Sequence, residues 1–333
     1  EASKVFSKDL MKKYGIPTAD YATFDDPAKV MDYIKAKGKY PVVIKADGLA
    51  LGKGVLICEN EEQAADGVKE IMLDKKFGAS GNHVVVEEFL TGPEVSVLSF
   101  TDGKVVKPMV SSMDHKRAND HDTGLNTGGM GTVAPNPYYT PAIAAECMEK
   151  IFLPTIQAMN AEGCPFKGCL YFGLMLTPDG PKVIEYNCRF GDPETQVVLP
   201  LLEGDLLHIM EACTNGTLAD EEVKFSDGAA ACVILASGGY PVAYEKGKPI
   251  SGLVDGQLPD EENVTVYHSG TALTEDGQLV TNGGRVLGVT ATGPRLTNAL
   301  SHAYEAAEKI HFDKLHKRSD IGLRALKALA EKQ

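Results

Sequence analysis

Three polar residues at alternate positions, Glu185, Asn187 and Arg189, end a stretch that otherwise has the pattern of a buried strand. Side chains in a strand alternate between its two faces, so these three should share one face while Tyr186 and Cys188 occupy the other. A carboxylate and an amide oxygen are suitable ligands for Mg²⁺, which completes its shell with phosphate oxygens and water. The nearby guanidinium can bind phosphate or carboxylate oxygens through two hydrogen bonds. The spacing therefore predicts a magnesium-phosphate site.

A second candidate site is the glycine-rich stretch 42–57, which has the pattern of two short strands joined by a loop. It is not a Walker A loop. Only three residues separate Gly48 from the Gly52–Lys53 pair, where that motif has four, and Gly54 follows the pair in place of Ser or Thr. Glycines allow the positive φ angles that turn successive backbone N–H groups toward an anion. We predict a flap over phosphate, with Lys45 on the entering strand directed at it. The alternative is an ordinary glycine hairpin with a solvated lysine.

Residues 83–90 read as a buried strand that ends in a polar and aromatic segment. A chain that leaves a strand can offer backbone N–H and C=O groups to the edge of an adenine ring, while aliphatic side chains enclose its faces. The alternative is that Glu87 and Glu88 are ordinary charges at a strand end.

The segment after the metal strand has the signals of a helix start. Asp192 suits the N-cap, Pro193 the first helical position and Glu194 the acidic first turn. A helix N-terminus close to a metal strand would favour an anionic substrate.

These candidate residues need a scaffold of mixed elements. Helical patterns alternate with strand patterns along the whole chain, which predicts an α+β fold. Clear helical stretches are 3–14, 27–36, 61–73, 142–162, 194–214 and 296–310.

Composition excludes several classes of protein. A net charge of −13 over 333 residues argues against nucleic acid as a partner, since neutralising phosphates requires a basic face. No apolar run reaches the ~18 residues that a membrane span needs. The seven cysteines form no C-x-x-C pair, which argues against a disulfide framework or a zinc site and favours a reducing, cytoplasmic setting.

The flap, the segment 87–90 that leaves the strand (the hinge) and the strand that carries Glu185 and Asn187 (the metal strand) together resemble those of the ATP-grasp superfamily. The loops 114–117 and 122–131, taken with 187–196, narrow the resemblance to the glycinamide ribonucleotide synthetase family, and it extends over essentially the whole chain. Two departures are visible: Leu51 stands where that family commonly has Ala, and Leu125 where it usually has Pro.

The resemblance implies an ATP-grasp fold, in which two α+β subdomains clasp ATP, followed by a smaller α/β domain. The expected units are the start of the core (1–18), the flap subdomain (19–90), the core with the metal and substrate loops (91–224) and the C-terminal domain (225–333). The family begins with a further glycine-rich domain before the segment that opens this chain, and some members are fused to other purine-pathway enzymes. We therefore expect this chain to bind MgATP but to ligate poorly by itself.

The implied activity is that of an ATP-dependent carbon–nitrogen ligase in purine biosynthesis. Glycine and 5-phosphoribosylamine would give glycinamide ribonucleotide, ADP and phosphate through glycyl phosphate, with ATP and Mg²⁺ or Mn²⁺ required. The alternatives are another ATP-grasp ligase with a different carboxylate and amine, or an ATP-binding fragment without turnover.

The resemblance also implies roles for individual residues. Arg189 and Lys45 would act in catalysis, and Glu185 and Asn187 would hold the metal. The ATP-binding residues would be Lys4, Lys45, Gly52, Lys53, Gly54, Glu87, Glu88, Phe89, Leu90, Glu94 (on the ribose hydroxyls), Arg117 and Asn126. The substrate-binding residues would be Asp114, Lys116, Asp122, Thr127, Gly128, Gly129, Gly191, Asp192, Pro193 and Glu194.

Overall fold

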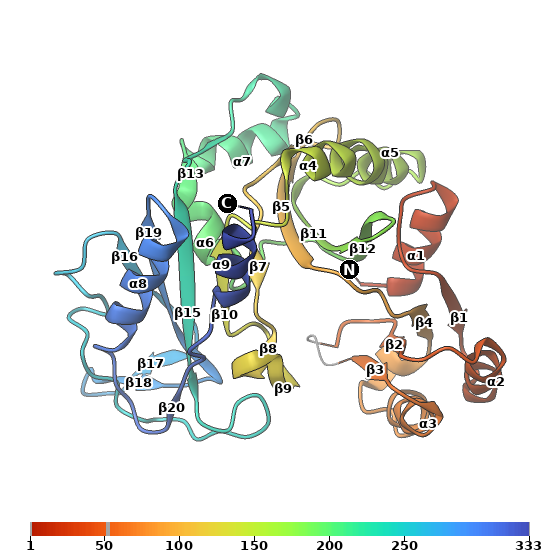
Figure 1. Cartoon of the computed structure of the whole chain (residues 1–333), viewed down its shortest axis with the longest axis horizontal. Coiled ribbons are helices and arrows are strands. Elements are labelled where there is room, and N and C mark those ends of the chain that lie inside the picture. Colours follow the sequence, from red (N-terminus) through yellow and green to blue (C-terminus); the bar gives the residue numbers. More distant parts are fainter. Residues whose placement is uncertain (1, 51–53, 333) are drawn as a thin grey trace.

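The computed structural model describes residues 2–50 and 54–332, which form three larger β-sheets with helices packed on them (Figure 1). The α-helices are α1 (Lys4–Lys13), α2 (Pro27–Lys37), α3 (Glu61–Val68), α4 (Pro141–Cys147), α5 (Leu153–Ala161), α6 (Thr195–Val198), α7 (Leu206–Asn215), α8 (Leu296–Ala307) and α9 (Leu323–Ala330).

The first sheet has the strand order β1-β4-β2-β3, with every neighbouring pair antiparallel. It contains β1 (Tyr21–Phe24), β2 (Val42–Ala46), β3 (Val55–Cys58) and β4 (Val84–Glu88). Helix α2 begins where the Asp26 side chain accepts a hydrogen bond from the Ala28 N–H, and it ends at Gly38 in the left-handed conformation. Helices α2 and α3 and this sheet enclose an apolar core that includes Val30, Ile44 and Val84.

The second sheet has the order β12-β11-β5-β6 and is also antiparallel. It contains β5 (Glu94–Thr101), β6 (Val106–Pro108), β11 (Gly168–Thr177) and β12 (Gly180–Asn187). Helices α4 and α5, joined by a π-helical turn at Met148–Phe152, share an apolar core with it. Within that core the rings of Phe152 and Phe172 are 4.4 Å apart between centroids. The predicted helix over 142–162 is confirmed.

The third sheet has the order β16-β19-β15-β10-β7, with β20 paired to β15. Its strands are β7 (Met113–Asp114), β10 (Gly131–Ala134), β15 (Ala229–Ser237), β16 (Val264–His268), β19 (Arg285–Gly293) and β20 (Leu315–His316). All nine residues of β15 are buried, and α8 packs against β15 and β19. Because β7 and β10 precede residue 225, this sheet joins both sides of the proposed boundary there. The division into four units stays a prediction.

Short pairs of strands complete the fold: β8 (Arg117–Asn119) with β9 (Thr123–Asn126), β13 (Leu202–Glu203) with β14 (Lys224–Phe225), and β17 (Thr271–Leu273) with β18 (Leu279–Thr281). The helical stretch predicted over 194–214 contains two helices and is interrupted between them. α6 is followed by a 3₁₀ turn and β13. α7 then begins after Asp205, whose carboxylate accepts hydrogen bonds from the backbone N–H groups of Leu207 and His208. In the described part of the chain, no helix is long and apolar enough to span a membrane.

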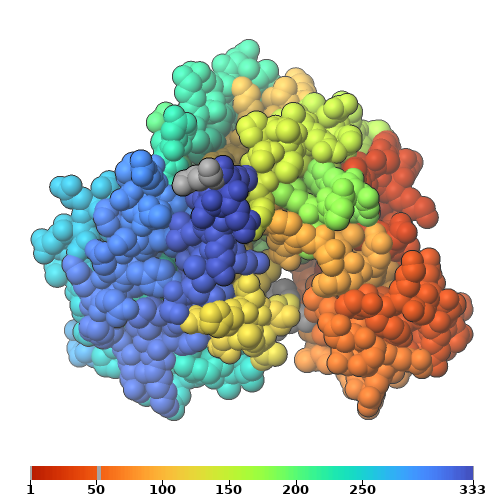
Figure 2. Space-filling model, viewed as in Figure 1, coloured from red at the N-terminus to blue at the C-terminus, as the bar shows by residue number. Residues whose placement is uncertain are grey.

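A hollow separates the first sheet from the β8–β9 hairpin, and it is visible between the orange and yellow surfaces in Figure 2. In Figure 1 the strands β2 and β3 lie on one side of this gap and β8 and β9 on the other, with β11 and β12 above them. We call this hollow the cleft. The predicted flap, hinge, metal strand and charged loop all come from elements around it.

Candidate functional site

A buried ion cluster connects the first sheet to helix α1. The Glu87 carboxylate at the end of β4 lies 3.0 Å from Lys45 Nζ and 3.1 Å from Lys8 Nζ. The three side chains are each at most 6% exposed. Lys45 Nζ also donates a hydrogen bond of 3.2 Å to the Ile184 carbonyl, which ties β2 to β12. Two lysines sharing one carboxylate leave a net positive charge when both are protonated, so this cluster suits a phosphate.

Lys8 was not among the predicted residues. Burial, with the nearby Lys45 charge, lowers the pKa of Lys8 to about 8 even though Glu87 is its partner. A sequence signal existed: Lys4 and Lys8 are four residues apart on one helix and therefore lie on the same face.

Lys4 joins α1 to the start of the predicted flap. Its Nζ donates a hydrogen bond of 3.0 Å to the Gly48 carbonyl, and its backbone N–H donates to the Asp47 carbonyl. Burial lowers the pKa of Lys4, with Lys45 adding to the shift and Glu185 opposing it. Of the predicted flap residues, Gly54 begins the second described segment, 54–332, whereas Gly52 and Lys53 lie outside the described residues.

The predicted hinge begins where β4 ends at Glu88, so Phe89 and Leu90 leave the sheet. The carboxylates of Glu87 and Glu88 are already engaged. Glu88 accepts a hydrogen bond of 3.1 Å from the Asp20 N–H and lies 3.3 Å from Lys182 Nζ. In the hinge, the groups left to meet an adenine ring are therefore those of the backbone.

Glu185 and Asn187 lie in the last three residues of β12, and the Asn187 side chain hydrogen-bonds to Glu185. Burial raises the pKa of Glu185, but the charges of Lys116, Lys45 and Lys4 together with this hydrogen bond bring it below its ordinary value. Glu185 is therefore an ionised carboxylate that the charges of three lysines stabilise. The same lysines could neutralise a phosphate chain beside it.

The donor set fits Mg²⁺. One carboxylate and one amide oxygen are hard ligands, and they leave the other coordination positions to phosphate oxygens and water. The residues that the structure describes include no cluster of three or more His, Cys, Asp or Glu side chains placed to hold a metal. A cation held by Glu185 and Asn187 would complete its shell with water and phosphate oxygens.

Arg189 lies two residues beyond the end of β12, and its place on the face of Glu185 and Asn187 stays a prediction. β12 ends at Asn187, and the chain turns before Arg189, whose Nη1 donates a hydrogen bond of 2.9 Å to the Phe190 carbonyl. Its catalytic role stays a prediction. Tyr186 does face the opposite way, into the core, where its hydroxyl lies 2.9 Å from Thr155 Oγ1.

The charged loop from Asp114 to Gly131 forms the opposite wall of the cleft. Lys116 Nζ lies 3.4 Å from Glu94 Oε2, and this neighbour raises the pKa of Lys116 well above its usual range. The backbone N–H and the hydroxyl of Thr127 both donate to the Lys116 carbonyl. The loop thus places the predicted ribose-binding carboxylate, Glu94, in direct contact with a predicted substrate lysine.

The β8–β9 hairpin holds three further predicted residues. Arg117 is paired in register with Asn126, and its Nη1 donates a hydrogen bond of 2.8 Å to the Gly124 carbonyl. Asp122, predicted to bind substrate, lies 3.0 Å from Arg318 Nη1. Its carboxylate is therefore engaged with the C-terminal segment.

Asp114 and Glu194 form an acidic pair on the inner side of the loop. Burial and the neighbouring Glu194 charge raise the pKa of Asp114 well above its usual range, and burial also raises the pKa of Glu194. Ser96 Oγ donates a hydrogen bond of 3.2 Å to Glu194 and lies 2.9 Å from the Tyr171 hydroxyl. Gly129, at φ +118°, leaves no room for a side chain, because a Cβ there would lie 2.6 Å from Asp114 Oδ1. The pair would be stabilised by an incoming cation.

Asp192 is not a helix N-cap, and that prediction is wrong. α6 begins only at Thr195, after a cis Asp192–Pro193 peptide bond. The Asp192 carboxylate instead lies 2.8 Å from Arg285 Nη2 and accepts a hydrogen bond from Gln196.

Arg285, at the start of β19, was missing from the predicted site. Its Nη1 donates hydrogen bonds of 2.9 Å to the Gly128 carbonyl and 3.0 Å to the Asp192 carbonyl. This one guanidinium therefore joins the substrate loop to the Gly191–Glu194 turn. In that turn a Cβ on Gly191 would lie 2.5 Å from Glu194 Oε2.

His115 anchors the loop to the C-terminal segment. Its Nδ1 lies 3.0 Å from the Gly131 carbonyl, and its Nε2 accepts a hydrogen bond of 3.1 Å from the Gly322 N–H. This pattern requires the neutral ring with the proton on Nδ1. Burial lowers the pKa of His115 to about 4, assisted by Arg324 and Arg318 and opposed by Asp122.

His115 should make folding stability depend on pH. The unfolded ring takes up a proton near pH 6.5, while the folded ring stays neutral down to about pH 4. The contribution of the neutral His115 ring to folding stability is therefore fully present above pH 6.5. It is lost as the pH falls toward 4, which lowers the free energy of unfolding by up to about 3 kcal/mol. We expect His115→Gln to flatten the pH dependence of the free energy of unfolding across this window. The exposed His302→Gln variant is the matched control, and equal slopes for the two variants in denaturant titrations would refute the assignment.

Two antiparallel sheets that enclose a cleft with lysines, a carboxylate and an amide oxygen define the ATP-grasp class of enzymes. Two family models match the chain: the ATP-grasp (A) domain of phosphoribosylglycinamide synthetase over residues 2–195 and its C domain over 230–324. The chain belongs to the phosphoribosylglycinamide synthetase family, and the predicted α+β ATP-grasp fold with a C-terminal domain is confirmed.

Individual relatives agree with this assignment. A phosphoribosylamine–glycine ligase of Vibrio parahaemolyticus is 46% identical over 100% of this chain and 76% of its own length. The crystal structure of phosphoribosylamine–glycine ligase from Thermotoga maritima matches with a TM-score of 0.87 and 39% identity, over 96% of this chain and 78% of that one. The trifunctional purine biosynthetic protein adenosine-3 of Gallus gallus is 47% identical over 99% of this chain and 33% of its own length.

Proposed function

We propose that the chain provides the ATP-grasp part of an enzyme that ligates glycine to 5-phosphoribosylamine in purine biosynthesis. The observation that carries the proposal is the convergence of Lys45, Lys116, Glu185 and Asn187 on one cleft, in a chain of this family. The fusion of the Gallus gallus relative to other purine-pathway activities supports the same pathway. The absence of a C-x-x-C pair among the seven cysteines of the sequence supports a reducing, cytoplasmic setting.

ATP would enter between the first and second sheets. The backbone after Glu88 would meet the adenine, and Glu94 the ribose. The phosphates would replace the Ile184 carbonyl as the partner of Lys45, whose ammonium group is already buried and oriented. Mg²⁺ or Mn²⁺ held by Glu185 and Asn187 would neutralise charge on the phosphates. Positioning and charge neutralisation, with no covalent enzyme intermediate, would account for the rate enhancement.

The acidic pair, Asp114 and Glu194, would hold the glycine ammonium group. An ammonium group beside the buried Glu194 and the half-buried Asp114 offsets the repulsion that contributes to the raised pKa of Asp114. A glycine carboxylate oxygen would then attack the γ-phosphorus, the bond to ADP would break, and glycyl phosphate would form. The amine of 5-phosphoribosylamine would attack the glycyl carbonyl carbon, and phosphate would leave with the carboxylate oxygen as the new amide nitrogen loses a proton.

The proposal predicts that the complete gene product releases ADP only when glycine is present. Alanine should react with a kcat/KM about 10- to 200-fold lower, because an added methyl group is worth ~1–3 kcal/mol in a fitted pocket. The measurement is a coupled ADP assay with mass detection of the ribonucleotide product. Equal rates with both amino acids, or ADP release without either, would refute it. Release with another carboxylate alone would favour a different ATP-grasp ligase.

A further inference from the structure

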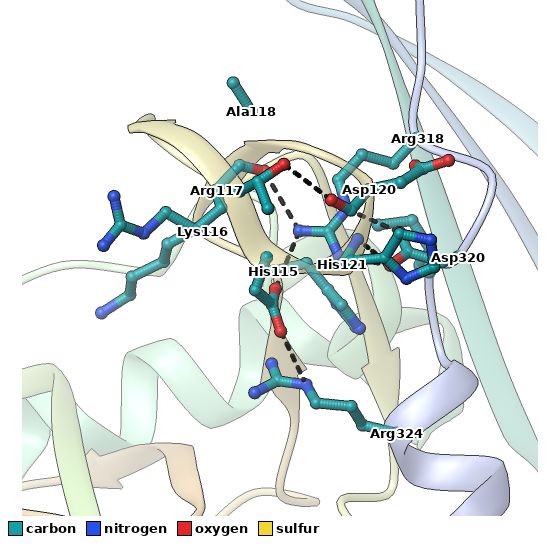
Figure 3. Close-up of polar contacts among 12 residues, drawn as sticks. His115, Lys116, Arg117, Ala118, Asp120, His121, Arg318, Asp320 and Arg324 are labelled. Atoms are coloured by element: carbon teal, nitrogen blue, oxygen red, sulfur yellow. Dashed lines mark hydrogen bonds and ion pairs between the residues drawn. The ribbon is translucent and has the colours of Figure 1, made fainter.

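The loop between β20 and α9 binds the β8–β9 hairpin through a buried arginine. Arg318 is 1% exposed, although it is charged. Its Nε and Nη2 donate to the two carboxylate oxygens of Asp320 at 2.8 and 3.0 Å. Its Nη1 donates to Asp122 Oδ1 at 3.0 Å and to the Arg117 carbonyl at 3.1 Å (Figure 3). One guanidinium thus contacts the first residue of β8 and the turn that precedes β9, about two hundred positions earlier in the sequence.

Neighbouring residues reinforce this contact. Further polar contacts between residues 316–320 and the hairpin are His316 Nε2 to the Ala118 carbonyl at 2.7 Å, the Ser319 N–H to Asp120 Oδ1 at 2.8 Å, and the His121 N–H to Asp320 Oδ2 at 2.8 Å. The Ser319 hydroxyl also donates to Asp120 Oδ2. We call residues 316–320 the clasp. Its contacts are to the backbone or to acidic side chains, so they fix the path of the hairpin chain itself.

The hairpin needs this support. All four residues of β9 are exposed, and a two-stranded hairpin without an apolar core is only marginally stable. His121 and Asp122 have φ angles of 58° and 52°, in the left-handed region that residues other than glycine rarely adopt. The clasp bonds the N–H of His121 and the carboxylate of Asp122.

The hairpin has a functional side as well as an anchored side. In Figure 3 the side chains of Lys116 and Arg117 point away from Arg318 and the clasp. Lys116 is the group whose charge acts on both Glu94 and Glu185, across the cleft from the first sheet. A displacement of the hairpin would therefore move a cation relative to the proposed metal and phosphate groups.

We propose that Arg318 is a positioning residue of the active site, which holds the β8–β9 hairpin so that Lys116 and Arg117 reach the reacting groups. The inference rests on the proposed function for its kinetic effect, but not for its structural one. Arg318 itself does not touch substrate; it acts through the Arg117 backbone and Asp122.

The test compares Arg318→Met and Arg318→Lys with the parent in the complete gene product. Arg318→Met keeps a long side chain without the guanidinium, so kcat for ligation should fall at least 10-fold. The Kd for MgATP should rise by a smaller factor, because two of the predicted ATP-binding residues, Arg117 and Asn126, lie in the hairpin. Amide hydrogen exchange should become faster in residues 116–126 and stay unchanged in β4. Arg318→Lys keeps the positive charge but lacks the planar guanidinium that donates several hydrogen bonds at once, so it should restore less than half of the activity that Arg318→Met loses.

Two controls separate positioning from stability. Val289→Ala, in the core of the third sheet, should lower Tm without changing kcat well below Tm. The exposed Arg295→Met should change neither quantity. If Arg318→Met does not fold, Ser319→Ala, which removes only the hydroxyl contact to Asp120, should give a smaller loss of kcat and faster exchange in 116–126.

The outcomes distinguish the two proposals. A parent enzyme without ligase activity would refute the proposed function, while the exchange data would still decide whether Arg318 holds the hairpin. Parent-like kcat and parent-like exchange in folded Arg318→Met would overturn the inference. So would a loss of MgATP affinity in proportion to the loss of kcat, because that would indicate general destabilisation.

Discussion

Lys45→Met is expected to lower kcat/KM for ATP about 100- to 1,000-fold. Removing one preorganised hydrogen-bond donor from a water-excluded site costs ~2.7–4 kcal/mol of transition-state stabilisation. The fold should survive, because Lys8 remains 3.1 Å from Glu87 and still neutralises it. Steady-state ADP release, with Tm measured in parallel, tests this expectation.

The matched control for Lys45 is Lys35→Met, which removes an exposed lysine paired with Glu61 on the surface. An exposed ion pair contributes little, so this variant should behave as the parent does. If Lys45→Met retained activity within threefold of the parent, Lys45 would not be the group that stabilises the transferred phosphoryl group.

Glu185→Gln should weaken binding of MgATP at least 10-fold and lower kcat about 100-fold. The amide keeps the shape of the carboxylate but removes the charge that a cation requires. The same change should leave metal-free ATP bound as tightly or more tightly, because Lys116, Lys45 and Lys4 would no longer have that carboxylate as a partner. This opposite response separates a metal ligand from a residue that merely supports the strand.

Isothermal titration with and without Mg²⁺ measures both affinities. Glu146→Gln, at a half-buried residue on α4 that pairs with Lys150, is the matched control and should change neither. If Glu185→Gln weakened the binding of MgATP and of metal-free ATP equally, a metal-binding role for Glu185 would be contradicted.

The local patterns of the sequence predicted those parts of the site that one strand or loop determines. Alternation along β12 placed Glu185 and Asn187 together, and the strand pattern of residues 83–88 gave β4 and the start of the hinge. Patterns of this kind depend only on the period of the strand, so a single sequence contains them.

Contacts between distant segments were not predictable in this way. Arg318 and Asp122 are brought together by the path of the chain through the third sheet, and Arg285 joins residues 128 and 192 for the same reason. The cap prediction at Asp192 failed because Arg285 and Gln196 contact that carboxylate. A local cap pattern gives no information about such distant partners.

The central claim is that the cleft transfers the γ-phosphoryl group of ATP to a glycine carboxylate. Glycine labelled with ¹⁸O in both carboxylate oxygens tests it most directly, in a complete reaction with ATP, Mg²⁺ and 5-phosphoribosylamine. If glycyl phosphate forms, the carbon–oxygen bond breaks when the amine attacks, and each released phosphate contains one ¹⁸O atom from glycine. Mass spectrometry of the phosphate should find that label in proportion to the ribonucleotide product. Product formation with unlabelled phosphate would contradict the account.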